Sequence, residues 1–102
     1  MPVGFTDRSG IKRRPAVIVS SDGYNAESPD VMIVSITGNL QALRHPGDHV
    51  IRHWRAAGLR PSLAQTKIAT VEAPALGRRL GRLALEDLAA FDRGLRDALD
   101  LP

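Results

Sequence analysis

Two runs of β-branched residues in the first third of the chain constrain its fold most. Residues 15–20 read PAVIVS and are followed by the turn formers SDG, and residues 31–37 read VMIVSIT and are followed by GN. Such runs predict strands, and a segment rich in Asp, Gly, Asn, Ser and Pro separates them. Antiparallel pairing of the two strands is therefore the simplest expectation.

The later segments indicate more strands and then a helix. Residues 49–53 are interpreted as a third strand and residues 63–71 as a fourth, whereas residues 76–83 fit no single element and residues 5–10 are interpreted as a polar loop. Strands first and a helix last predict a mostly β (α+β) protein, an antiparallel barrel or sheet with a C-terminal helix across it.

The helix is expected over residues 86–99, where the spacing of the apolar residues changes to that of a helix. Its apolar stripe consists of Leu88, Phe91, Leu95 and Leu99. Ala84 is a poor N-cap and Gly94 weakens the middle of the segment. We therefore expect this helix to depend on its packing partner.

Length and composition favour one soluble domain over residues 1–102. The chain has 102 residues, of which 43% are hydrophobic, and it has no cysteine. The lack of cysteine favours a reducing compartment and leaves no Cys-based metal site. No apolar stretch approaches the ~18 residues of a membrane span, so a cytoplasmic protein is expected.

The positive charge lies in the first part of the chain. The formal charge is +3, and residues 1–60 carry eight Lys or Arg against five Asp or Glu, whereas residues 61–102 carry six of each. This distribution favours an anionic partner. The plain alternative is a mildly basic soluble domain.

Arg14 and Thr37 are the candidate catalytic residues. The proline after Arg14 pushes Arg14 into an extended conformation at the start of its strand. If Ser20 pairs with Val31 as the first rung, counting along both strands places Arg14 opposite Thr37, with Cβ atoms about 5 Å apart. A slip of one residue would place the two side chains on opposite faces.

This pair of side chains suits a phosphate. Arginine holds two phosphate oxygens with a planar fork, and threonine adds one directional donor. RNA can be cut without metal when a 2′-hydroxyl attacks the adjacent phosphate, and such a pair would stabilise the charged phosphorus centre. Which group moves the protons is left open, because arginine is a poor base. The alternative is that Arg14 belongs to a surface ion pair.

Longer motifs resemble the MazF/PemK family of toxin endoribonucleases. FTDRSGIKRRPAVIVSSDGYN and VMIVSITGN carry the likeness, and HWRAAGLRPS, KIAT and GRRLGRLALEDL follow in the order and spacing of that family. The resemblance covers nearly the whole chain. Its most specific element is Arg-Pro at a strand start, with Thr at the end of the next strand.

The resemblance implies a small SH3-like antiparallel barrel of the CcdB/PemK type, usually a homodimer. It implies sequence-specific cleavage of single-stranded RNA at short sequences, without metal or other cofactor. It also implies an antitoxin with an acidic segment that covers the RNA channel. Arg14 and Thr37 match the family's catalytic residues.

The same resemblance implies contacts outside the catalytic pair. Residues 5–13 are expected to form a loop that matches a mobile segment of the family, which contacts RNA or antitoxin. Arg8, Lys12 and Arg13 of this loop are therefore RNA-binding candidates. For Lys12 and Arg13, simple solvation is the alternative. Asn25 matches a family Tyr-Asn and is a further candidate, although it could equally be a turn former.

Two departures from the family pattern keep alternatives open. Compared with the family pattern, the first strand is expected to be clipped at the N-terminus, and residues 63–71 offer Gln65, Thr66 and Lys67 where some relatives have an acidic residue. No general base is therefore assigned. The alternatives are a non-catalytic RNA- or antitoxin-binding barrel and a CcdB-like gyrase inhibitor, although the chain lacks the Trp near the C-terminus that the latter uses.

The remaining chemistry-bearing residues favour structural roles. His45, His49 and His53 are spaced by four, but Pro46-Gly47 breaks any helix, so histidines on the surface or barrel rim are expected rather than a metal site. Trp54 is expected to pack beside a turn at Gly58, with stacking on RNA as the alternative.

Overall fold

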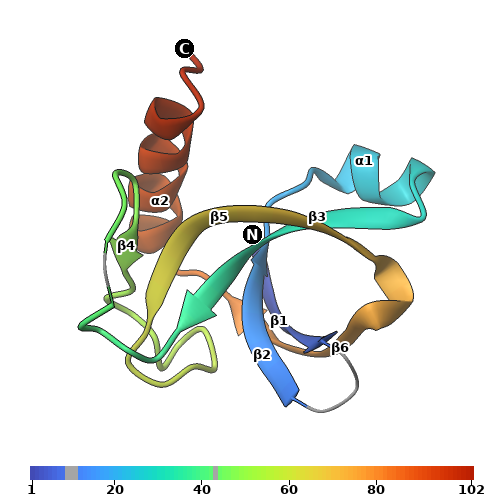
Figure 1. Ribbon diagram of the computed structural model, residues 1–102, viewed down its shortest axis with the longest axis horizontal. Helices are drawn as coiled ribbons and strands as arrows, with labels where there is room; N and C mark the ends of the chain where they lie inside the picture. Colours follow the sequence, from blue (N-terminus) through green and yellow to red (C-terminus); the bar gives the residue numbers. More distant parts are fainter. Residues whose placement is uncertain (9–11, 43) are drawn as a thin grey trace.

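The computed structural model is a curled antiparallel sheet with one long helix packed beside it (Figure 1). It describes the backbone of residues 1–8, 12–42 and 44–102, and the side chains of these residues other than 5–8 and 12. The elements are β1 (Pro2–Arg8), β2 (Lys12–Ile18), α1 (Asp22–Glu27), β3 (Asp30–Thr37), β4 (His49–Val50), β5 (Leu63–Glu72), the 3-10 helix η1 (Ala73–Ala75), β6 (Leu76–Arg82) and α2 (Leu85–Ala98). The mostly β fold with a C-terminal helix is confirmed.

The sheet has the strand order β4-β5-β3-β2-β1-β6, and all neighbouring strands are antiparallel. Figure 1 shows the long strands curling around the interior, with α2 beside β4 and β5. Because β4 and β6 form the two edges, the hydrogen-bonded sheet is open rather than a closed barrel.

The register between β2 and β3 is the predicted one. Ala16 lies opposite Ser35 and Val17 lies opposite Val34. The pairing continues beyond the strand, where the Val19 N–H donates to the Met32 carbonyl at 2.9 Å. This register brings the start of β2 and the end of β3 to the same end of the sheet.

Buried apolar side chains on both faces of β2 and β3 explain the continuous runs in the sequence. Val3, Val17 and Val34 form a buried row across β1, β2 and β3, in a cluster that includes Phe91 of α2. Ile33 belongs to a second cluster on the other face. Strands that are covered on both faces lose the alternation of polar and apolar residues.

The polar loop expected over residues 5–10 is wrong for residues 5–8. These residues belong to β1. The backbone of β1 pairs with β2 as far as the pair of Arg8 and Lys12, and it pairs with β6 on its other edge. The backbone hydrogen bonds of two neighbouring strands therefore outweigh the polar composition. Ser9 and Gly10 lie outside the described residues.

The segment between the first two predicted strands contains a short helix. The Ser21 hydroxyl caps α1 by accepting from the Tyr24 N–H at 3.1 Å. Ser and Asp at the start of a segment are typical N-terminal helix signals, so the sequence carried this information.

The predicted third strand is shorter than expected. Only His49–Val50 pair as β4, because the N–H groups of Arg52 and His53 turn to Asp87 at 2.8 and 2.9 Å. The ambiguous segment 76–83 forms β6, and the predicted fourth strand is confirmed as β5.

Helix α2 forms where it was predicted. Ala84 is its N-cap and provides no side-chain cap, while Phe91 and Leu95 are buried. Leu99 is 49% exposed, so the apolar stripe ends before it. Among the described residues, no helix is long and apolar enough to cross a membrane.

Two glycines let α2 approach the loop before β4 closely. A Cβ on Gly94 would lie 2.9 Å from the Gly47 carbonyl, and a Cβ on Gly47 would lie 2.7 Å from the Gly94 carbonyl. Gly47 also has φ of 93°, a conformation that favours glycine. Gly94 therefore weakens the helix in isolation but permits backbone-to-backbone packing.

Asp87 fastens the first turn of α2 to the segment after β4. It is fully buried and accepts from the N–H groups of Arg52 and His53, and its Oδ1 lies 2.7 Å from His49 Nε2. Burial disfavours the charged form, but these hydrogen bonds outweigh it and lower the pKa of Asp87 below its usual 3.8. The stabilisation is therefore present above about that pH and is lost as pH falls through the folded value.

We expect Asp87→Ala to lower the free energy of unfolding by about 3 kcal/mol near neutral pH, because it leaves buried donors without an acceptor. Asp92→Ala, which removes only an exposed pair with Arg96, should change it by less than about 0.5 kcal/mol. Urea unfolding measures both variants. The deficit of Asp87→Ala should narrow as the pH falls below 3.8, and a deficit independent of pH would contradict the role of the charged carboxylate.

Candidate active site

Arg14 and Thr37 line the same cavity. The cavity has a volume of about 240 Å³ and lies where β2 begins and β3 ends. Arg14 is exposed and Thr37 is half-buried. Because the ladder between β2 and β3 has the predicted register, the two candidate residues are brought together as expected.

The Thr37 hydroxyl is held in place by its own turn. Thr37 Oγ1 accepts from the Asn39 N–H at 3.1 Å. A threonine hydroxyl also carries one hydrogen to donate, and it remains available for a ligand. The turn after β3 therefore orients the hydroxyl at the mouth of the cavity.

A bulge in β5 supplies the opposite wall. Val34 pairs with Ile68 and Ile36 pairs with Ala64, so residues 65–67 lie opposite Ser35 alone. Gln65 and Lys67 line the cavity together with Ser35. Bulges commonly re-aim side chains beside functional sites, and this one turns two polar side chains toward Arg14.

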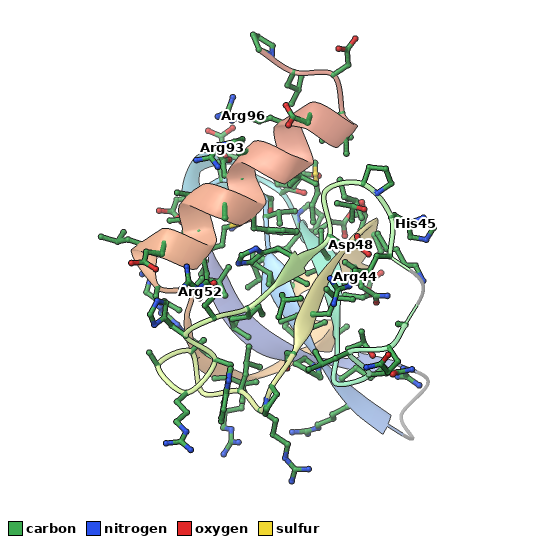
Figure 2. The ribbon with its side chains drawn as sticks, turned by 90° about the vertical axis from the view of Figure 1, so that its left-hand side faces the viewer. Arg44, His45, Asp48, Arg52, Arg93 and Arg96 are labelled. Atoms are coloured by element: carbon green, nitrogen blue, oxygen red, sulfur yellow. The ribbon has the colours of Figure 1, made fainter. Side chains whose placement is uncertain are left out.

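Asp48 holds this bulge in place by hydrogen bonds with Thr66. Its Oδ1 accepts from the Thr66 N–H at 2.7 Å and from the Thr66 hydroxyl at 2.8 Å. Figure 2 shows Asp48 and His45 on the loop beside α2. Burial opposes ionisation of Asp48, but hydrogen bonds from the N–H groups of His45 and Thr66 and from the Thr66 hydroxyl lower its pKa below the usual value.

The cavity is positively charged. Arg14 and Lys67 are its charged residues, and no carboxylate of the described residues lines it. Ser35, Thr37 and Gln65 add polar groups. This set of donors suits an anion such as a phosphate, and it offers no aspartate, glutamate or histidine to take a proton.

The other predicted RNA contacts are distributed differently. Arg13 is exposed and lines a second cavity beside the first one. Arg8 and Lys12 pair through their backbones at the end of the β1–β2 hairpin, and their side chains lie outside the described part. The expected loop location of Lys12 and Arg13 is wrong, because both residues belong to β2.

Asn25 does not line the cavity, and it lies far from Arg14. Its Nδ2 donates to the Ser20 carbonyl at 3.3 Å, and its Oδ1 accepts from the Ser20 hydroxyl at 2.5 Å. Ser20 is six residues beyond Arg14, which corresponds to about 20 Å along an extended chain. The amide thus fastens α1 to the end of β2.

Trp54, His49 and His53 contact other side chains of the protein. Trp54 packs against the core cluster, and the Arg55 guanidinium lies 5.0 Å from its ring centroid. His45 is exposed, and His53 contacts Glu86 at 3.0 Å. His49 differs from the surface expectation because it is partly buried against Asp87.

Comparison with protein families identifies the chain. Residues 3–99 match the model of PemK-like, MazF-like toxins of type II toxin–antitoxin systems. The chain belongs to this family. The match spans nearly the whole chain and includes both walls of the cavity.

Relatives of this MazF-like chain have similar lengths. Endoribonuclease MazF6 of Mycobacterium tuberculosis is 34% identical over 92 residues, which cover 88% of this chain and 81% of the relative. Endoribonuclease MazF2 of Mycobacterium bovis has the same identity and coverage.

Solved structures share the fold of this MazF-like chain. M. tuberculosis toxin MazF-mt6 has a TM-score of 0.79 at 22% identity, over 100% of this chain and 99% of that one. An endoribonuclease in complex with its cognate antitoxin, from a mycobacterial species, has a TM-score of 0.82 at 24% identity, over 99% and 93%.

The Asp48–Thr66 contact gives a prediction about the wall of the cavity. Thr66→Val keeps the side-chain shape and removes one donor, so the free energy of unfolding should fall by about 1 kcal/mol. The amide resonances of Gln65 and Lys67 should also shift. Thr70→Val, at an exposed threonine of the same strand, is the control and should do neither. Equal behaviour of the two variants would show that the hydroxyl contact with Asp48 does not hold the bulge.

Proposed function

We propose that this MazF-like toxin cleaves single-stranded RNA, including messenger RNA, without a metal ion, in the cavity lined by Arg14 and Thr37. The observation that carries the proposal is the convergence of these two side chains, from adjacent strands, on one positively charged cavity. Family membership and relatives named as endoribonucleases support it. The same points favour RNA cleavage over inhibition of gyrase.

In this reaction the RNA supplies its own nucleophile. The ribose 2′-oxygen attacks the adjacent phosphorus and loses its proton, a new O–P bond forms, and the bond from phosphorus to the 5′-oxygen breaks. The products are a 2′,3′-cyclic phosphate and a 5′-hydroxyl, which takes up one proton. No cofactor enters this balance.

Arg14 is assigned to the phosphorus centre. Its guanidinium stays charged at any relevant pH and can hold two of the oxygens on which negative charge accumulates. The Thr37 hydroxyl donates a further hydrogen bond to the same group, from a position fixed by the Asn39 N–H. Donors held in place before the reaction stabilise the transition state without reorganisation.

RNA contacts away from the reacting atoms are assigned to Arg8, Lys12 and Arg13 around the β1–β2 hairpin. Their charges would hold the backbone of a single strand, which binds in positively charged grooves. Asn25 would reach only a distant part of the strand, because it lies at the other end of β2.

Partners and location follow from the same proposal. An antitoxin segment with acidic side chains would neutralise Arg14 and Lys67 and thereby exclude RNA from the cavity. One relative of the same fold is an endoribonuclease described in complex with its cognate antitoxin. We further propose a homodimer that acts in the cytoplasm.

A second candidate function is RNA or antitoxin binding without cleavage. The observation that favours it is the cavity wall of the described residues, which contains no carboxylate to accept a proton. The two candidates differ in one outcome, because only the first produces cyclic phosphate ends.

The test is cleavage of a mixed single-stranded RNA in EDTA. We expect wild-type protein to leave 2′,3′-cyclic phosphate ends and Arg14→Ala to lose at least about 100-fold in rate while remaining folded. Thr37→Val should lose about 10-fold or more. Arg93→Ala, an exposed arginine on α2 that lines neither cavity (Figure 2), should cut at the wild-type rate.

Two results would change these conclusions. If Arg14→Ala and Thr37→Val both cut at the wild-type rate, the assigned site is wrong. If wild-type protein binds the RNA but releases no cyclic phosphate ends with or without EDTA, the binding candidate replaces the endoribonuclease.

A further inference from the structure

A second cavity lies beside the candidate active site. Its volume is about 520 Å³, within the range of about 300–1,000 Å³ that is typical of ligand sites. Its apolar lining includes Pro15, Leu59 and Leu80, and its charged lining residues are Arg13 and Arg60. The cavity therefore combines an apolar surface with two charges.

Pro15 is a wall of both cavities. Arg13 and Arg14 are consecutive in β2, and because side chains alternate along a strand they face opposite sides of it. Gly38 lines the second cavity directly after Thr37, which lines the first. A polymer that lies across this end of the sheet would thus pass from one cavity to the other.

The shape of the second cavity is fixed by a close backbone contact. Gly58 has φ of 77°, and a Cβ on it would collide with the Leu80 carbonyl. The Ser62 hydroxyl donates to the Arg60 carbonyl at 2.6 Å, which holds the segment that carries Arg60. The cavity is therefore built by a constrained turn against β6 and not by a loose loop.

Among the described side chains, neither arginine forms an ion pair with a carboxylate. The ion pairs of these side chains are His49–Asp87, His53–Glu86 and Arg96–Asp92. Asp7 lies opposite Arg13 in the ladder of β1 and β2, and its side chain is outside the described part. The guanidinium groups of Arg13 and Arg60 can meet an anion. A guanidinium can bind a phosphate with two hydrogen bonds or stack on the flat face of a base.

We propose that this second cavity is an RNA subsite that binds the nucleotide next to the scissile linkage. Arg13 and Arg60 contact its phosphate, and its base lies against Leu59, Leu80 and Pro15. The proposal rests on the proposed function, since it extends the same RNA strand from the cavity of Arg14 and Thr37. Arg60, from the turn before β5, becomes a specificity-determining residue.

The test compares Arg60→Ala with Arg93→Ala, which removes the same charge from an exposed position on α2. The probe is a fluorescent single-stranded RNA of mixed sequence, made uncleavable by 2′-O-methyl groups. We expect Arg60→Ala to weaken binding about 10-fold, the size of one charged contact, and to reduce the salt slope by about 0.7. Arg93→Ala should change neither quantity.

Three further measurements test the same subsite. The ratio between wild-type and Arg60→Ala affinities should shrink as the probe is shortened to a dinucleotide. Arg60→Lys, which keeps the charge and loses the fork, should bind with intermediate affinity and serves as the variant to measure if Arg60→Ala does not fold. Light scattering should give wild-type and variant proteins the same mass.

The possible outcomes test the RNA subsite and the proposed function separately. Binding by Arg60→Ala equal to that of Arg93→Ala would overturn the subsite even if wild-type protein cleaves RNA. A change in mass would assign the cavity to an interface between copies, and weaker binding of an acidic peptide alone would assign it to a protein partner; both results overturn the proposal. If Arg60→Ala weakens binding of the probe as expected but wild-type protein never cleaves RNA, the cavity remains an RNA-binding site and only the proposed function fails.

Discussion

The pairing of β2 with β3 is the constraint on which the site depends. A slip of one residue in the register would move every side chain of one strand to the other face of the sheet, so side chains that pack in one cluster would face the other cluster instead. Here Val17 and Val34 face one cluster, and Ile33 faces another. The core therefore sets the position of Arg14 relative to Thr37, although neither residue belongs to the core.

Two carboxylates, the half-buried Asp48 and the buried Asp87, hold the loops in place as the core holds the strands. Asp48 holds the β5 bulge, and Asp87 holds the segment after β4 against α2. Each accepts from two backbone N–H groups, which explains why the chain leaves the sheet at these places without orphaned donors. Asp48 thus helps to shape the wall of the cavity of Arg14 and Thr37 without lining it.

The features that could be predicted from the sequence are those with a local signal. The strands around Val17 and Val34, their register, the helix with Phe91 and the pair of Arg14 and Thr37 all follow from periodicity, turn residues and one proline. The β5 bulge and the early end of β4 could not be predicted, because both depend on Asp48 and Asp87, which meet their partners across the fold. The strand over residues 5–8 was missed since its polar composition conceals its backbone pairing with two neighbours.

The paired glycines 47 and 94 have a consequence for how such a chain can diverge. Position 94 sits in a helix, where alanine is ordinarily the better residue, yet any side chain there would push against the backbone that leads directly into Asp48. Residues 94 and 47 can therefore change only together if the cavity lined by Arg14 and Thr37 is to keep its shape. Substitution patterns at these two sites should be correlated among natural variants, even though neither glycine approaches a ligand.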